Sequence, residues 1–159
     1  MISVSKSVFV NPPDEGVVLT REDVWKGLVL KAENALPFVP AMTMCEVKAR
    51  TETTIEREIE FRGERFGERI TFDPQNQVKF VRTSGSVLGS IRNEIEEEDG
   101  ELRLRFSFDL ELQGVEPGSD AEKEYERTMS GDYLKAVDAT LAAIRRWVRE
   151  GTPASEASV

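Results

Sequence analysis

Residues 42–112 alternate apolar and polar side chains again and again, and one long amphipathic segment follows them. A period of two is the pattern of β-strands that bury one face. About six short runs of this kind, separated by turn residues, predict an antiparallel sheet. The final run alternates without a break through the apolar residues Leu102, Leu104, Phe106, Phe108, Leu110 and Leu112.

The residues before these runs predict one more strand and one helix. Residues 2–10 keep the period of two, and Asn11-Pro12-Pro13 ends that strand. Thr20 has the sequence context of a capping box, and the apolar residues after it follow helical spacing to about Asn34. The proline-bracketed residues 35–40 leave room for at most one further turn of helix.

The segment after the sheet predicts a long helix that covers it. Ser119 and Glu122 fit the S-x-x-E capping box. Apolar residues at spacings of three and four place one face of this helix on the sheet. They are Tyr125, Met129, Tyr133, Val137, Leu141, Ile144 and Val148. We expect Trp147, near the end of this helix, to face solvent. We expect residues 1–150 to form a single α+β domain. Residues 151–159 should be a flexible tail.

Composition argues against several classes of function. Asp and Glu number 30 against 21 Lys and Arg, a formal net charge of −9 with no basic stripe, so we expect no binding to nucleic acid. The chain contains no His. This excludes Ser-His-Asp and Cys-His catalysis and removes the usual ligands of zinc and non-haem iron, so we expect neither a metal nor a cofactor.

The chain also lacks the marks of export or membrane insertion. Its N-terminus has no apolar core of the signal-peptide kind, and nowhere do roughly 18 apolar residues run together. The single cysteine, Cys45, excludes an intramolecular disulfide. These features predict a cytoplasmic protein that does not insert into a membrane.

Three segments resemble the AtaL-like family of the START/birch-pollen-allergen-like superfamily. They are residues 19–34, Phe38-Val39-Pro40 and Gly100-Glu101-Leu102-Arg103-Leu104. The resemblance covers about residues 4–151 and implies the helix-grip fold. In that fold a curved antiparallel sheet of about seven strands wraps around a long C-terminal helix, with one or two short helices after the first strand.

The resemblance implies a range of functions but no catalytic residue set. One member of the family comes from a fungal acetylaranotin biosynthetic cluster. Relatives in the wider superfamily bind lipids, hormones or polyketides, or cyclise and dehydrate them. A sheet curved around one helix also tends to enclose a pocket.

Polar residues at inward positions of the strands are the first candidates for a ligand site. Arg57 shares a face with Ile55 and Ile59, and Glu68 has the same kind of position one strand later. The pair could meet across the ladder and give a pocket a polar floor. Alternatively, a bulge or an open end of the sheet turns one or both outward, which the cost of burying charge favours. Asn93 could bind a ligand or tie down a loop.

Apolar residues complete the predicted ligand-binding set. Phe106 and Phe108 come from the last strand, and Met129, Tyr133 and Val137 come from the long helix. For Met129 and Tyr133, simple core packing is the alternative.

The predicted function is binding of a small hydrophobic or aromatic molecule, lipid-like or polyketide-like, in an internal cavity, by a monomer or homodimer. The alternative is a cyclase or dehydratase in which Arg57 or Tyr133 polarises a carbonyl and Glu68 moves a proton. That mechanism requires Glu68 to be buried but only loosely paired, because an ion pair lowers the pKa of a carboxyl group. A protein-interaction role ranks third, since the outward positions are mainly charged.

Overall fold

Seven strands form one antiparallel sheet in the computed structural model, which describes residues 1–151. They are β1 (Ile2–Phe9), β2 (Met42–Arg50), β3 (Thr54–Phe61), β4 (Glu64–Asp73), β5 (Gln77–Ser84), β6 (Val87–Glu98) and β7 (Glu101–Leu112). Strands β2 to β7 follow one another as antiparallel neighbours, and β1 pairs with β7 at the far edge. The predicted α+β helix-grip fold is confirmed.

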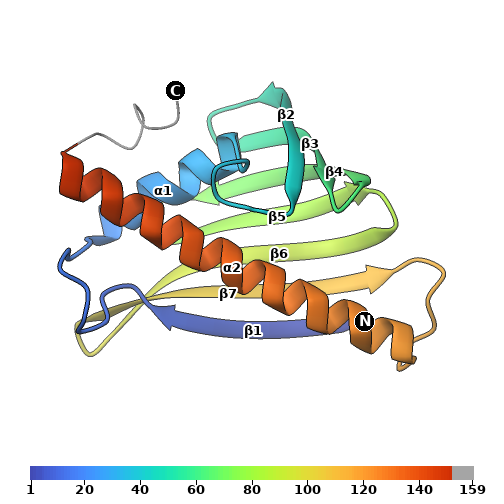
Figure 1. Ribbon diagram of the computed structural model, residues 1–159. Coiled ribbons are helices and arrows are strands. Elements are labelled where there is room, and N and C mark those ends of the chain that lie inside the picture. The colour runs from blue at the N-terminus through green and yellow to red at the C-terminus, as the bar shows by residue number, and fades with distance from the viewer. Residues whose placement is uncertain (152–159) are drawn as a thin grey trace.

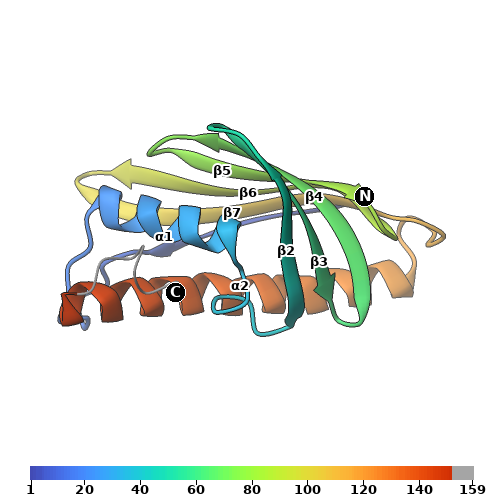
Figure 2. The ribbon, with the colours of Figure 1, turned by 90° about the horizontal axis from the view of Figure 1, so that it is seen from above.

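Two helices, α1 (Arg21–Glu33) and α2 (Asp120–Glu150), lie on the same face of the sheet (Figure 1). Figure 2 shows the sheet curving over α2, with β2 and β3 descending beside it. One short helix follows β1, and residues 35–40 form turns rather than a second helix. Of the predicted tail at 151–159, only Gly151 is among the described residues.

Helix α1 begins at the predicted capping box. The Thr20 hydroxyl accepts from the Asp23 backbone N–H, and the Asp23 carboxylate accepts from the Thr20 N–H. Gly27 is buried where α1 meets α2, and a Cβ at this position would collide with Cδ1 of Ile144. The absence of a side chain therefore lets the two helices approach closely.

Helix α2 is continuous over 31 residues, from the Ser119 cap to Gly151, whose φ of 71° ends it. Most of the predicted apolar stripe is buried, but its end is displaced: Val148 is 40% exposed and Trp147 only 6%. The expectation that Trp147 faces solvent is therefore wrong. The turns at residues 35–40 bring Phe38 edge-on to Trp147, with 5.7 Å between ring centroids.

The inward residues of the central strands make a core against α2. In β3 to β7 the fully buried ones include Ile55, Ile59, Ile70, Val78, Leu104, Phe106, Phe108 and Leu110. The edge strand β2 is different, because most of its residues after Met42 are exposed or half-buried and its pairing with β3 shifts register twice. Each of the strands β3 to β6 also buries one polar residue. They are Arg57, Glu68, Arg82 and Asn93.

Candidate functional site

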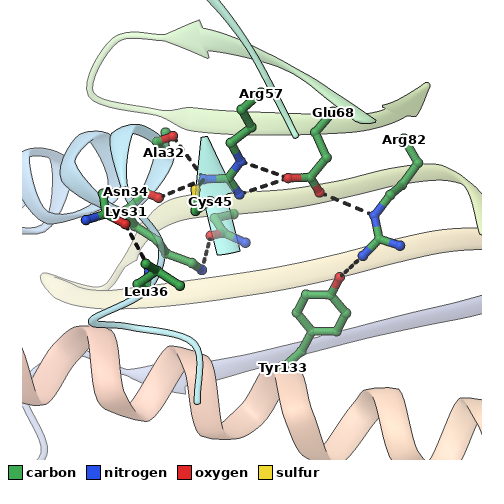
Figure 3. Close-up of polar contacts among 10 residues, drawn as sticks. Lys31, Ala32, Asn34, Leu36, Cys45, Arg57, Glu68, Arg82 and Tyr133 are labelled. Carbon is green, nitrogen blue, oxygen red and sulfur yellow. Dashed lines mark hydrogen bonds and ion pairs between the residues drawn. The ribbon is translucent and has the colours of Figure 1, made fainter. Parts of the chain in front are cut away.

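Three neighbouring strands each place one charged residue in the core: Arg57 on β3, Glu68 on β4 and Arg82 on β5. They are 5%, 4% and 4% exposed, so the alternative in which Arg57 or Glu68 points outward is wrong. Arg57 and Glu68 are directly cross-strand, and a register shift at Gly67 brings Glu68 opposite Arg82. The Glu68 carboxylate bridges both guanidinium groups, at 2.9 Å from Arg57 and 3.3 Å from Arg82 (Figure 3).

Arg57 also fixes helix α1 to the sheet. Its Nη1 donates to the backbone carbonyls of Lys31 at 3.0 Å and Ala32 at 2.9 Å. These carbonyls belong to the last turn of α1, which has no further helical N–H groups to bind them. A cation at this end also suits the helix dipole. Arg57 is thus fully engaged in holding the structure together.

A buried lysine reaches the same cluster from α1. Lys31 donates from Nζ to Oδ1 of Asn93 on β6, at 2.9 Å. Asn93 therefore binds a side chain of helix α1 and does not hold a loop in place. Lys31 was absent from our predictions, although it stands seven residues after Val24 and three after Leu28, both on the buried face of α1.

Arg82 links the cluster to helix α2. Its Nη2 donates to the Tyr133 hydroxyl at 3.4 Å, and its guanidinium carbon lies 4.1 Å from the centre of the Phe66 ring. Its Nη1 is buried and has no hydrogen-bond partner. Arg82 is also absent from the predicted site residues, although it alternates in phase with Val78 and Phe80 on the buried face of β5.

Burial and charge shift the protonation equilibria of this cluster. Burial alone would raise the pKa of Glu68, but attraction to Arg57 and Arg82 holds it below its ordinary value. Burial, with repulsion from Arg57, lowers the pKa of Lys31 to about 8. Burial also raises the pKa of Tyr133, which therefore stays a neutral phenol. The enzymatic alternative requires a loosely paired Glu68. In the structure Glu68 is instead paired with two arginines, Arg57 and Arg82.

The cluster surrounds a small inner cavity of about 30 Å³. This has room for about two water molecules. Its walls are Lys31, Val39, Met42, Arg57, Ile59, Phe61, Glu68, Phe80, Arg82, Ile91, Asn93, Tyr133 and Ala136. The cavity is much smaller than a ligand, so the expectation of an internal cavity that holds a whole ligand is wrong.

A larger groove opens between the β3–β4 hairpin and the first turns of α2. It measures about 460 Å³ and is lined by Phe61, Arg62, Glu64, Phe66, Ala121, Glu124, Tyr125, Thr128 and Met129. That volume falls in the range of small-molecule sites. Phe61 lines both hollows, so the groove and the inner cavity share one aromatic side chain.

The predicted site residues divide into three groups. The inner cavity is lined by Arg57, Glu68, Asn93 and Tyr133, whereas Met129 lines the groove. Phe106, Phe108 and Val137 line neither hollow and are packed in the core. The alternation of the strand predicts burial for Phe106 and Phe108, and helical spacing predicts it for Val137.

Within residues 1–151, no three Cys, Asp or Glu side chains lie close enough together to hold a metal ion. Neither described helix has an apolar stretch of the length needed to cross a bilayer.

Similar proteins of known structure share this architecture. An aromatase/cyclase, Zhui, from Streptomyces sp. R1128 superposes with a TM-score of 0.70 at 16% identity, over 92% of this chain and 95% of its own. A START superfamily protein from Mycobacterium smegmatis gives 0.64 at 18% identity, over 92% and 98%. At these identities the similarity establishes the fold.

Sequence comparison establishes the family. Acetylaranotin biosynthesis cluster protein L from Aspergillus terreus is 26% identical over 152 residues, which cover 94% of this chain and 91% of the fungal protein. The sequence model of the acetylaranotin biosynthesis cluster protein L family matches residues 4–151 of this chain. The chain therefore belongs to the acetylaranotin biosynthesis cluster protein L family.

Proposed function

We propose that the protein binds a small hydrophobic or aromatic molecule between its sheet and helix α2. The observation that carries this proposal is the groove of about 460 Å³ between the β3–β4 hairpin and α2. Phe61, Phe66 and Met129 give it an apolar wall, and Tyr125 adds an aromatic ring with a polar end. Apolar walls with a few fixed polar groups are typical of small-molecule sites.

The polar cluster behind the groove gives the ligand an orientation. The inner cavity has room for a polar group of a ligand but not for its apolar body. The body therefore lies in the groove. Phe61 lines both hollows, and we expect deeper entry to displace its side chain.

The names of similar proteins are consistent with a small organic molecule as the ligand. The solved structures include an aromatase/cyclase and a START superfamily protein, and the fungal relative is named for a biosynthetic cluster. A polyketide-like or lipid-like molecule is accordingly the class of ligand to screen first.

Native mass spectrometry of protein purified from its own host tests the proposal, followed by a binding screen of lipids and aromatic polyketides. Ala121→Trp should weaken binding at least about tenfold, because the added ring fills the groove that Ala121 lines. Ala142→Trp makes the same change at an exposed position of α2 and is the matched control. No copurified ligand and no binder in the screen would refute the proposal, as would equal binding by both variants.

A cyclase-type enzyme acting on a polyketide-like substrate is the second candidate. The Tyr133 phenol and the Arg82 guanidinium meet at the inner cavity and could polarise a carbonyl together. Glu68 is poorly suited to moving a proton, because two arginines stabilise its charged form. If there is turnover, Tyr133→Phe should abolish most of it while leaving substrate affinity within about threefold, and unchanged turnover by this variant would exclude the role.

A further inference from the structure

Positive charge exceeds negative charge around the inner cavity. Lys31, Arg57 and Arg82 line it together with Glu68, which is the one carboxylate among the lining residues in the described part of the chain. All four residues are at most 6% exposed. Three cationic groups therefore share one anion in a region from which bulk water is excluded.

Such an imbalance is costly, because a buried charge without a counterion loses most of its hydration. The lowered pKa of Lys31 reports this cost, since burial and the charge of Arg57 both disfavour the protonated amine. Water in a cavity of about 30 Å³ can accept hydrogen bonds but cannot neutralise the charge. An anionic group could do both.

Arg82, which lines the inner cavity, has a free donor. Its Nε and Nη2 are engaged by Glu68 and Tyr133, and Nη1 is buried without a partner. Figure 3 shows this nitrogen pointing away from both partners. The guanidinium packs over the ring of Phe66, which lines the groove, so Arg82 lies between the groove and the inner cavity.

The two carboxylates that line the groove are more exposed than Glu68. Glu124 is well exposed and pairs with Arg127 at 2.8 Å, and Glu64 accepts from the Ser86 backbone N–H at 2.9 Å. Water screens their charge far more than it screens the buried cluster. The balance at the inner end is therefore positive.

We propose that the ligand carries an acidic oxygen, as a carboxylate, enolate or phenolate, which binds to Nη1 of Arg82 while the apolar part occupies the groove. Lys31 adds positive charge to the wall of the same cavity, and the neutral phenol of Tyr133 can donate a further hydrogen bond. This inference rests on the proposed binding function and narrows it to acidic molecules.

Matched acid and amide pairs test the inference on the intact protein. The probes are 2-naphthoate, 9-anthroate and dodecanoate, each compared with its primary amide by calorimetric titration at pH 7. The members of a pair share their apolar skeleton, so a difference in affinity reports the charged oxygen. We expect the acid to bind at least about tenfold more tightly in the pairs that bind.

Arg82→Gln should remove this preference, and Arg92→Gln should retain it. Arg92 is a half-exposed arginine on the neighbouring strand β6 and lines neither hollow, which makes it the matched control. A preference that survives in Arg82→Gln would overturn the inference, because the acid would then bind elsewhere. Equal or weaker binding of the acids by the unaltered chain would also overturn it, yet leave the binding function standing.

A measurement on the unaltered chain covers the case in which Arg82→Gln does not fold. Binding of the acid should raise the pKa of Lys31, measured by NMR titration of the side-chain amine, because the new negative charge favours the protonated form. An unchanged Lys31 pKa in the presence of saturating acid would overturn the inference. If no acid and no amide binds at all, the proposed function fails, and the inference fails with it.

Discussion

Replacing Lys31 by Met should stabilise the protein near neutral pH. Met has a similar length and removes the buried charge. The pKa of Lys31 is lowered from 10.5 to about 8. This difference of about 2.5 units corresponds to about 3 kcal/mol, at about 1.4 kcal/mol per unit. The wild-type chain therefore bears a cost of about 3 kcal/mol below pH 8, where the folded state must hold the proton on Lys31.

The sign of the pH dependence follows from proton binding. Between about pH 8 and pH 10.5 the unfolded chain keeps the proton on Lys31 and the folded chain does not. The unfolded state thus binds more protons in this window, and the stability of the wild type rises with pH. From pH 7 to pH 9.5 the wild type should regain about 2 kcal/mol that Lys31→Met cannot regain.

The assay is urea denaturation of the two proteins at several pH values from 6 to 9.5. Loss of the hydrogen bond to Asn93 costs Lys31→Met about 1–3 kcal/mol at every pH. The variant's advantage at pH 7 is therefore between about 0 and 2 kcal/mol, and the change of that advantage with pH is the diagnostic quantity. Lys26→Met, at an exposed position of the same helix, is the control and should show a difference below about 0.5 kcal/mol. A constant difference between Lys31→Met and wild type over this pH range would refute the reasoning.

Three further substitutions test the packing and the charge cluster. Glu68→Gln should lower the free energy of unfolding by about 3–5 kcal/mol, because it leaves two buried arginines without a counterion; a loss below 1 kcal/mol in urea denaturation would contradict the burial of the cluster. Gly27→Leu should cost about 1–3 kcal/mol through collision with Ile144, and a smaller side chain at 144 should restore part of the loss. Phe38→Ala should shift the fluorescence emission of Trp147 to longer wavelength as water gains access to the indole, and an unchanged spectrum would show that the ring is not covered by residues 35–40.

The order of elements could be predicted because the local signals agree with the tertiary fold. Uninterrupted alternation in residues 102–112, the capping box at Thr20 and the N-cap at Ser119 each match an observed element. The end of α2 was harder, since spacings of three and four after Ile144 allow either Trp147 or Val148 to be buried. Contact with the turns at residues 35–40 decides it, and no local pattern contains that contact.

The site was predicted only in part for a related reason. Arg57 and Glu68 stand out because their inward neighbours are apolar, but a charged residue in phase with a buried face has two explanations until its partners are known. Arg82 is the second cationic partner of the buried Glu68 carboxylate. It lies opposite Glu68 because the pairing of β4 with β5 shifts register at Gly67. The cluster also fills the interior, so the size of the cavity depended on side-chain packing that periodicity does not describe.

Binding of a ligand between the β3–β4 hairpin and α2 is the central claim, and an amide NMR titration with 2-naphthoate tests it most directly. The account predicts that the largest chemical-shift changes cluster at groove residues, among them Phe66, Tyr125 and Met129. Another hollow, distinct from the groove and the inner cavity, lies under β1 on the other flank of α2 and is lined in part by Val4 and Leu134. Changes concentrated there, or none at saturating concentration, would contradict the account.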